Sequence, residues 1–332
     1  LPMAGVSWEP VTLATHLRSI SCACVRVSEN QVAFVGRRKH TEDLPEGQVC
    51  VIVTMLSDGT LDEDVVPLPW EHDTVQDGMA LHGGRVYMLL QPRKYESDGS
   101  LSRWYQSYFL NTGSVATLTL DTREVSVQPA SEAPRAMYVN SLFTLGETWY
   151  IAGREQRKAG GYHNAIQTIL TYHFPTNRWN RLRLPRRSVP DIEWSAVVGE
   201  TAYLISPNPD ASRMFTYAQH GGFCELEGEG PPSMEPDSHV TVLGSHIVCH
   251  VPDRDGRVSV HSYSTVSGDW TAHPATDQLS GYFIGQGIGS DAVLLINREE
   301  VDGGYTPSCR DAYILATVTP PPGDDTVSLT LE

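Results

Sequence analysis

The sequence predicts an all-β fold, a six-bladed β-propeller in which each blade is a sheet of four antiparallel strands. The main observation is a repeat, because a turn followed by a short apolar run occurs six times at intervals of 45 to 62 residues. The mean interval, (289 − 30)/5 or about 52 residues, is close to the roughly 50-residue period of a propeller blade. A second observation is that no apolar run reaches the roughly 20 residues of a membrane-spanning helix. The six turns lie at Asn30, Gly84, Gly146, Gly199, Gly244 and Gly289.

Each repeat divides into four short β segments, as a blade requires. Residues 138–184 show this most clearly. YVNSLFTL predicts the first strand, TWYIAG the second strand after the turn at Gly146, AIQTILTYHF the third and RWNRLRL the fourth. The third segment alternates apolar and polar residues, which is typical of a strand.

We expect one domain over residues 1–332, because every blade of a propeller adds a layer to one closed ring. The ring needs a closure, since an open sheet edge would otherwise remain. Residues 5–13, GVSWEPVTL, predict an outer strand for the last blade, and the C-terminal TVSLTLE competes for the same place. We favour closure by the N-terminal strand. The predicted blades cover approximately residues 17–70, 75–131, 135–187, 190–231, 234–275 and 279–320.

The aligned repeats share a hydrophobic second strand, which ends in glycine at Gly36 and Gly153, and they show an aromatic residue near the end of the third strand and a tryptophan at the start of the fourth. Trp179 and Trp270 occupy this last place, and Phe223 occupies the equivalent one. The pattern resembles the kelch repeat over essentially the whole chain. The resemblance implies a kelch-like propeller. Kelch propellers commonly bind acidic motifs through one face, and some are enzymes, including copper radical oxidases and sialic acid epimerases.

The net charge and the cysteine content indicate which classes of partner and which cellular compartment to expect. With 24 basic and 40 acidic residues the formal net charge is −16, which opposes non-specific attraction to nucleic acid or anionic lipid. We therefore expect no nucleic acid and no membrane as partners. Six scattered cysteines are too few for a disulfide scaffold and predict a reducing compartment, the cytoplasm, with the nucleus as an alternative. Because LPMAGVSWEP lacks an initiator Met, we expect the chain to be part of a larger protein or complex.

Basic residues gather in the segments that join second strands to third strands and in one link between blades. Since successive strands of a blade reverse direction, these segments emerge on one face of the ring, where 12 of the 24 basic residues lie. We expect a positive rim that binds a protein partner, such as an acidic or phosphorylated peptide, because arginine forks match carboxylate and phosphate geometry. Alternatively, these arginines pair with acidic residues of their own loops, such as Glu155, and keep the loops solvated. The predicted partner-binding residues are Arg37, Arg38, Arg93, Lys94, Tyr95, Trp104, Arg154, Arg157, Tyr162, Arg186, Arg187, Arg298 and Tyr305.

No segment predicts a catalytic centre. The sequence contains no G-x-S-x-G, H-E-x-x-H or C-x-x-C motif. GQGIG at residues 285–289 is similar to half of a dinucleotide-binding motif, but it lies in a predicted inner strand with no helix after it. It therefore predicts close packing of strands near the axis. We expect no cofactor, no metal and no catalytic residue.

These observations predict a non-catalytic protein-recognition or scaffolding domain. The alternative is a kelch-type carbohydrate-active enzyme, such as a sialic acid epimerase or mutarotase. In that case the basic, aromatic-lined channel mouth would hold a carboxylated sugar through an arginine clamp.

Overall fold

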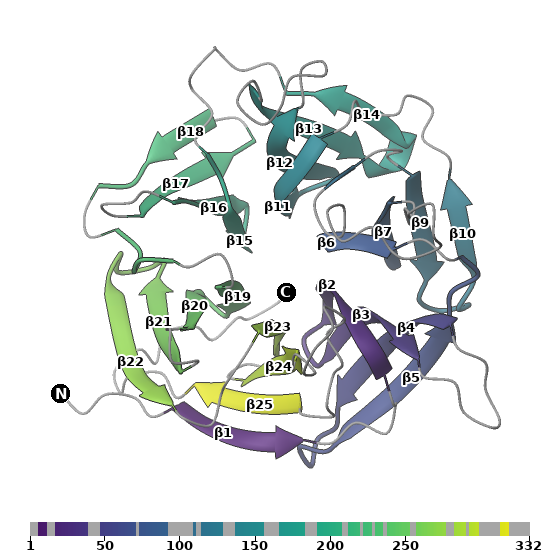
Figure 1. The fold of residues 1–332 in the computed structure, drawn as a ribbon, viewed down its shortest axis with the longest axis horizontal. Coiled ribbons are helices and arrows are strands. Elements are labelled where there is room, and N and C mark those ends of the chain that lie inside the picture. The colour runs from purple at the N-terminus through teal and green to yellow at the C-terminus, as the bar shows by residue number, and fades with distance from the viewer. Residues whose placement is uncertain are drawn as a thin grey trace, which may run out of the picture.

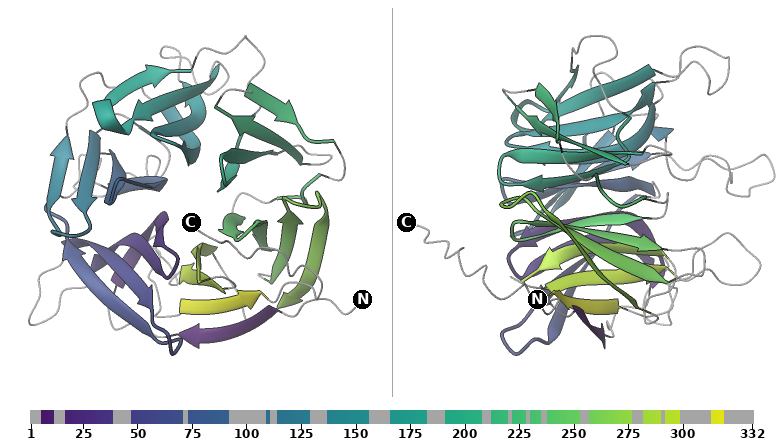
Figure 2. Two further views of the ribbon diagram at one scale, coloured as in Figure 1. Left: turned by 180° about the vertical axis from the view of Figure 1, so that it is seen from behind. Right: turned by 90° about the vertical axis from the view of Figure 1, so that its left-hand side faces the viewer.

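The fold is an all-β propeller with four-stranded antiparallel blades, as the sequence predicts. The computed structural model describes residues 6–11, 17–38, 47–70, 73–91, 109–110, 114–128, 137–155, 166–182, 191–207, 212–219, 222–227, 230–234, 238–252, 257–276, 282–289, 292–298 and 313–318. Within them the strands form six sheets set around a common centre (Figure 1). Five of these sheets have four strands and one has five. Seen edge-on, the ring is flattened (Figure 2).

We number the sheets one to six in chain order of their innermost strands. Sheet one contains β2 (Leu17–Ser28), β3 (Gln31–Arg38), β4 (Gly47–Met55) and β5 (Leu61–Pro67). Sheet two contains β6 (Asp73–His82), β7 (Arg85–Gln91), β9 (Ser114–Thr119) and β10 (Val125–Gln128). Sheet three contains β11 (Met137–Leu145), β12 (Thr148–Glu155), β13 (Ile166–His173) and β14 (Arg178–Arg181), with the short β8 (Phe109–Leu110) beside β11.

The second half of the ring repeats this arrangement. Sheet four contains β15 (Trp194–Val198), β16 (Thr201–Ser206), β17 (Arg213–Ala218) and β18 (Gly222–Glu225). Sheet five contains β19 (His239–Leu243), β20 (His246–Pro252), β21 (Val258–Ser264) and β22 (Trp270–Thr276). Sheet six contains β23 (Tyr282–Ile288), β24 (Ala292–Arg298), β25 (Tyr313–Val318) and β1 (Val6–Val11).

The turns between first and second strands lie where the sequence places them. Five of the six turn positions are glycines whose φ angles are +55° to +71°. This left-handed conformation is open to glycine at no steric cost, so each apolar run begins directly after a tight reversal. In sheet three the chain then continues through β13 and the single-turn 3-10 helix Phe174–Thr176 into β14.

Strand β1 closes the ring. It pairs antiparallel with β25, with Val6 opposite Val318 and Val11 opposite Tyr313, and so becomes the outer strand of sheet six. The competing segment TVSLTLE lies outside the described residues. Near the axis, the Arg26 guanidinium of sheet one donates to the carbonyl oxygen of Gly289 at 2.9 Å, which ties sheet one to sheet six.

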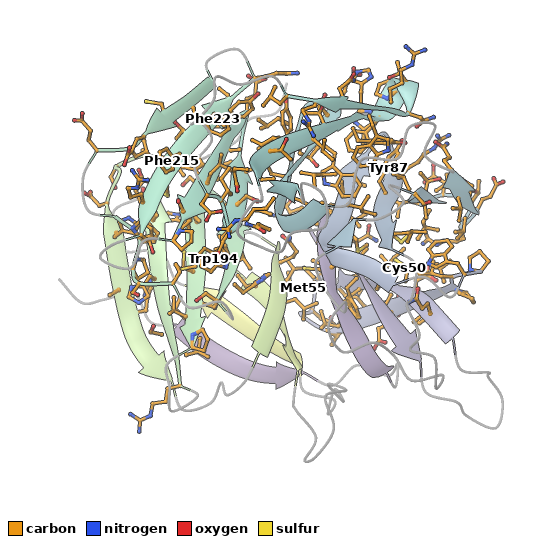
Figure 3. All side chains as sticks on the ribbon, turned by 45° about the horizontal axis from the view of Figure 1, so that its top comes forward. Cys50, Met55, Tyr87, Trp194, Phe215 and Phe223 are labelled. Carbon is orange, nitrogen blue, oxygen red and sulfur yellow. The ribbon has the colours of Figure 1, made fainter. Side chains whose placement is uncertain are left out.

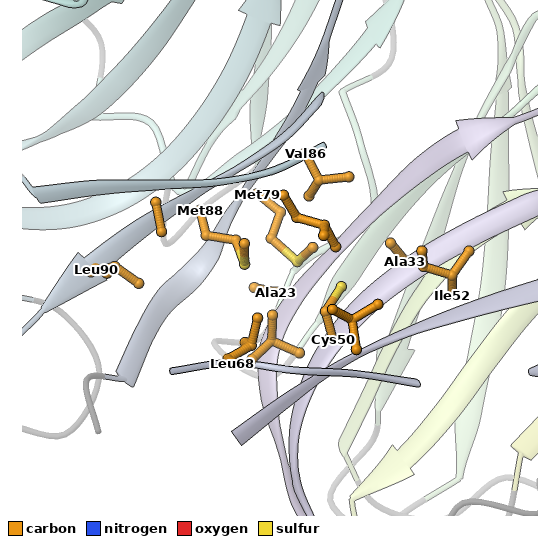
Figure 4. Close-up of a cluster of buried hydrophobic side chains, with 13 residues drawn as sticks. Ala23, Ala33, Cys50, Ile52, Leu68, Met79, Val86, Met88 and Leu90 are labelled. Atoms are coloured by element: carbon orange, nitrogen blue, oxygen red, sulfur yellow. The ribbon is translucent and has the colours of Figure 1, made fainter. Parts of the chain in front are cut away.

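The core lies between neighbouring sheets, and alternate residues of one strand serve different neighbours. In β3, Phe34 belongs to a buried cluster that includes Leu294 of sheet six. The preceding residue, Ala33, belongs to a cluster that includes Met88 of sheet two (Figure 4). This follows from the two-residue period of a strand. Burying one large side chain such as Phe34 stabilises the fold by about 1.5–3 kcal/mol.

Among the described residues, no helix has the length and apolar character needed to span a bilayer.

Candidate functional site

The innermost strands of all six sheets line one cavity on the axis of the ring. Its volume is about 330 Å³, at the lower end of the roughly 300–1,000 Å³ that is usual for small-molecule sites. Strands β11 and β15 supply a polar wall, β19 and β23 supply further polar groups, and β2 and β6 supply Cys24, Val25 and Met79. The ring therefore brings residues that are far apart in the sequence to one chamber.

Two serines from neighbouring sheets are joined on the polar wall. Ser141 of β11 donates from its hydroxyl to the hydroxyl oxygen of Ser195 of β15 at 2.7 Å. Ser195 in turn donates to the carbonyl oxygen of Leu142 at 2.9 Å. Both serines line the cavity, and Ser141 is buried. This short relay fixes the orientation of both hydroxyl groups.

A carboxyl group lies next to this relay. Glu193 precedes β15 and lines the cavity. Burial raises the pKa of the Glu193 carboxyl, and the nearby negative charge of Asp191 raises it further, while Arg154 acts in the opposite direction. A carboxyl in a cavity whose pKa is moved towards neutrality is a candidate general acid or base.

The positive charge of Arg154, which acts on this carboxyl, is already paired. Arg154, at the end of β12, forms an ion pair with Asp191, and both side chains are partly exposed. The partner thus comes from the segment that leads into sheet four, not from the loop of Arg154 itself. Arg154 is one of the predicted site residues, so at this position part of the expected positive rim is neutralised across two sheets.

His239 of β19, in the sheet next to that of Ser195, also lines the cavity. Its Nε2 atom lies 3.0 Å from both the amide nitrogen and the carbonyl oxygen of Gly285 in β23. The unprotonated nitrogen accepts from the amide, whereas the protonated one donates to the carbonyl. Behind it lies His250, whose pKa is lowered to about 3 by complete burial and secondarily by His239, so His250 is neutral in the fold.

The cavity also contains an indole group held by a hydrogen bond and two side-chain amides. Trp194, which is labelled in Figure 3, donates from its indole nitrogen to the carbonyl oxygen of Ser238 at 3.0 Å. The side-chain amides of Asn140 and Gln286 line the cavity without a hydrogen bond to another described residue. Each amide can both donate and accept. The chamber therefore offers oriented hydroxyls, a carboxyl and two amides, a set that suits a polyhydroxylated ligand. In the described ranges, no three His, Cys, Asp or Glu residues group closely enough to hold a metal ion.

Most residues of the predicted rim lie outside the described residues. Four predicted residues lie at the ends of second strands: Arg37 and Arg38 in β3, Arg154 in β12 and Arg298 in β24. Because equivalent strands run in the same direction in each sheet, the topology puts all four at one face of the ring. The predicted residues outside the described part of the chain are Arg93, Lys94, Tyr95, Trp104, Arg157, Tyr162, Arg186, Arg187 and Tyr305.

The polar lining of the axial cavity was not predicted from the sequence. Its polar residues interrupt otherwise apolar inner strands, as in VNS before residue 142, EWS before residue 196 and GQG before residue 288. A comparison of the six inner strands at equivalent positions would have found this signal, because a polar side chain next to the axis of a propeller needs a partner or a ligand.

Comparisons with known proteins establish the fold class only. No family model matches the chain, and no curated protein matches it, so the kelch resemblance stays a prediction. The chain is similar to a solved structure described as the structure of YjhT, with 12% identity, a TM-score of 0.61 and coverage of 91% of this chain and 95% of that one. It is also similar to a Trypanosoma rangeli sialidase in complex with the inhibitor DANA, with 8% identity, a TM-score of 0.57 and coverage of 95% of this chain. The match spans 60% of the sialidase chain, less than two thirds of it.

These similarities correct the main functional prediction. The sequence predicts a non-catalytic recognition or scaffolding domain, but the propellers that resemble nearly the whole chain include a sialidase, which is an enzyme. That prediction is therefore wrong. The charged loops of the rim are conspicuous in the sequence, whereas the polar residues of the inner strands stand singly within apolar runs and give a weaker signal.

Proposed function

We propose that this chain is a carbohydrate-active enzyme, a six-bladed kelch-like propeller that binds an acidic monosaccharide such as sialic acid in its axial cavity and interconverts its anomers. The observation that carries the proposal is Glu193, a half-buried carboxyl with a raised pKa in a polar chamber of about 330 Å³. A general base works best when its pKa lies near the working pH. The expected cytoplasmic location and the expected protein partner stay predictions.

The proposed reaction needs one proton acceptor in the cavity. The Glu193 carboxylate takes the proton of the anomeric hydroxyl, and the bond between the anomeric carbon and the ring oxygen breaks. The electron pair of that bond goes to the ring oxygen, which takes a proton from water, and the open-chain keto form results. Rotation about the adjacent carbon–carbon bond and the reverse steps then give the other anomer, and Glu193 returns the proton.

An anomer-converting reaction fits the described residues better than glycoside hydrolysis does. Most glycosidases place two carboxyl groups on either side of the scissile bond. Along the described cavity wall, Glu193 is the one carboxyl group. Ring opening of a free sugar needs a single base together with solvent, so this wall is sufficient for it.

The acidic group of the sugar would lie at the mouth of the cavity. Arg37, Arg38 and Arg298 end second strands at the face from which Arg154 also emerges. Arginine forks bind carboxylates in a bidentate manner, and such a clamp would orient the sugar before ring opening. The rim residues predicted from the sequence thus become candidates for holding a carboxylated sugar.

The experiment is a turnover assay of N-acetylneuraminate anomers, with the two anomers followed by NMR exchange at a pH where the uncatalysed conversion is slow. We expect the wild-type chain to accelerate the exchange and Glu193→Gln to lower the rate by about 100-fold or more, the usual contribution of a general base. Glu225→Gln is the matched control, because this carboxylate is exposed and pairs with Arg213 away from the cavity. The proposal fails if folded wild-type protein does not change the exchange rate, or if both variants retain it equally.

A further inference from the structure

We infer that the wall of the cavity between sheets three and four is a surface of hydrogen-bond acceptors that selects hydroxyl donors of the substrate. The sugar therefore enters with its hydroxyl-bearing end against Ser141 and Ser195 and with its carboxylate away from them. This inference rests on the proposed function and goes further, because it names the part of the substrate that the cavity recognises.

The relay consumes every donor of the two serines. A serine hydroxyl has one proton and two lone pairs. The proton of Ser195 goes to the carbonyl oxygen of Leu142 and the proton of Ser141 goes to Ser195. Ser141 keeps two lone pairs and Ser195 keeps one. The pair therefore offers three acceptor positions and no donor.

The groups next to the two serines also do not donate hydrogen bonds to the cavity. Glu193 stands two residues before Ser195 and also lines the cavity, and residues two apart on extended chain point to the same side. A carboxylate only accepts hydrogen bonds. The donor of Trp194 is used within the protein, because its indole nitrogen donates to Ser238.

Such a wall rejects a carboxylate. At Ser141 and Ser195 a carboxylate of the substrate would face acceptors alone and would lose its hydration without a donor in return, which is costly. A hydroxyl of the substrate would satisfy a lone pair of Ser141 or Ser195. The wall therefore orients the sugar, and the amides of Asn140 and Gln286, which also line the cavity, can serve its remaining polar groups.

The test uses N-acetylneuraminate analogues in which one hydroxyl at a time is replaced by fluorine, which has a similar size but cannot donate. Binding is measured by calorimetric titration. We expect one position at which fluorine weakens binding to the wild-type chain by about 2- to 12-fold, the value of one hydrogen bond. At that position Ser195→Ala should reduce the loss to less than about 2-fold, because it frees the proton of Ser141 to donate to the fluorinated analogue.

Two further variants complete the experiment. Ser206→Ala removes a buried serine of sheet four that does not line the cavity. This variant should show the same loss of binding to the fluorinated analogues as the wild type. Ser141→Ala removes both acceptor positions of Ser141 and leaves two on Ser195, and it repeats the test if Ser195→Ala does not fold. If N-acetylneuraminate binds but no position discriminates, or if the discrimination persists in both cavity variants, the inference is overturned while the proposed function stands. If folded wild-type protein binds none of these sugars, both are overturned.

Discussion

Replacing Gly287 with alanine should destabilise the ring at the junction of sheets five and six. Gly287 lies in β23, and a Cβ atom added to it would overlap the carbonyl oxygen of Val242 in β19 and approach Nη1 of Arg26 to 3.5 Å. The overlap is with backbone, which cannot rotate away as a side chain can. The two inner strands would have to separate, and the arginine contact that ties sheet one to sheet six lies beside them.

The expected cost follows from overpacking. One extra methyl group in a tightly packed site destabilises by about 1–3 kcal/mol. For 332 residues, an unfolding entropy of about 2.1 cal/mol/K per residue gives about 0.7 kcal/mol/K in total. Division of the cost by this entropy predicts a fall in Tm of about 1.5–4 °C.

Urea unfolding and thermal unfolding of the variant measure this cost. Gly47→Ala is the matched control, because no atom lies within 4 Å of a Cβ added at the start of β4. It should leave the free energy of unfolding within about 0.5 kcal/mol of the wild type, as surface changes do. Equal stability of Gly287→Ala and Gly47→Ala would refute the close approach of β23 and β19 and with it the packing of strands around the axis.

The remaining predictions concern titration. Asp191→Asn should lower the pKa of Glu193 and move the acidic limb of the pH–rate profile to lower pH, because the Asp191 charge helps burial to raise that pKa. Arg154→Gln should raise the pKa of Glu193 and move the same limb to higher pH. If both variants show the acidic limb at the same pH, the role of Glu193 is contradicted. The unfolding free energy should fall as the pH drops from about 6.5 towards 3, by at most about 1.4 kcal/mol per pH unit from His250. The sign follows because the unfolded chain binds a proton in this window that the buried, neutral His250 does not. Denaturant titrations across this range should show a smaller slope for His250→Gln, and an unchanged slope would refute the assignment.

The blades could be predicted because their signals are local. TWYIAG after Gly146 predicts a second strand, and β12 spans Thr148–Glu155; the turn and the apolar run lie next to each other in the chain, and glycine makes the reversal. The closure was harder, because both termini carry a β-rich segment. Which of the two segments pairs with β25 depends on contacts between distant parts of the chain, and the local sequence pattern does not contain this information.

The site could be predicted less well than the fold. The arginines of the loops are conspicuous in a sequence, but Arg154 pairs with Asp191, 37 residues away, and no loop pattern predicts such a partner. Ser141 and Ser195 are separated by 54 residues and meet only because two inner strands lie side by side. A single serine in an apolar strand is unremarkable in sequence. GQGIG, in contrast, was interpreted correctly as close strand packing, because Gly287 has no room for a Cβ atom.

A crystal structure of the chain with N-acetylneuraminate tests the central claim most directly. The account predicts one sugar on the axis of the ring, with hydroxyl groups against Ser141 and Ser195, the anomeric hydroxyl within hydrogen-bond reach of Glu193 and the carboxylate at the mouth. A sugar bound on the outer surface with an empty axial cavity, or a sugar whose carboxylate faces Ser141 and Ser195, would contradict it.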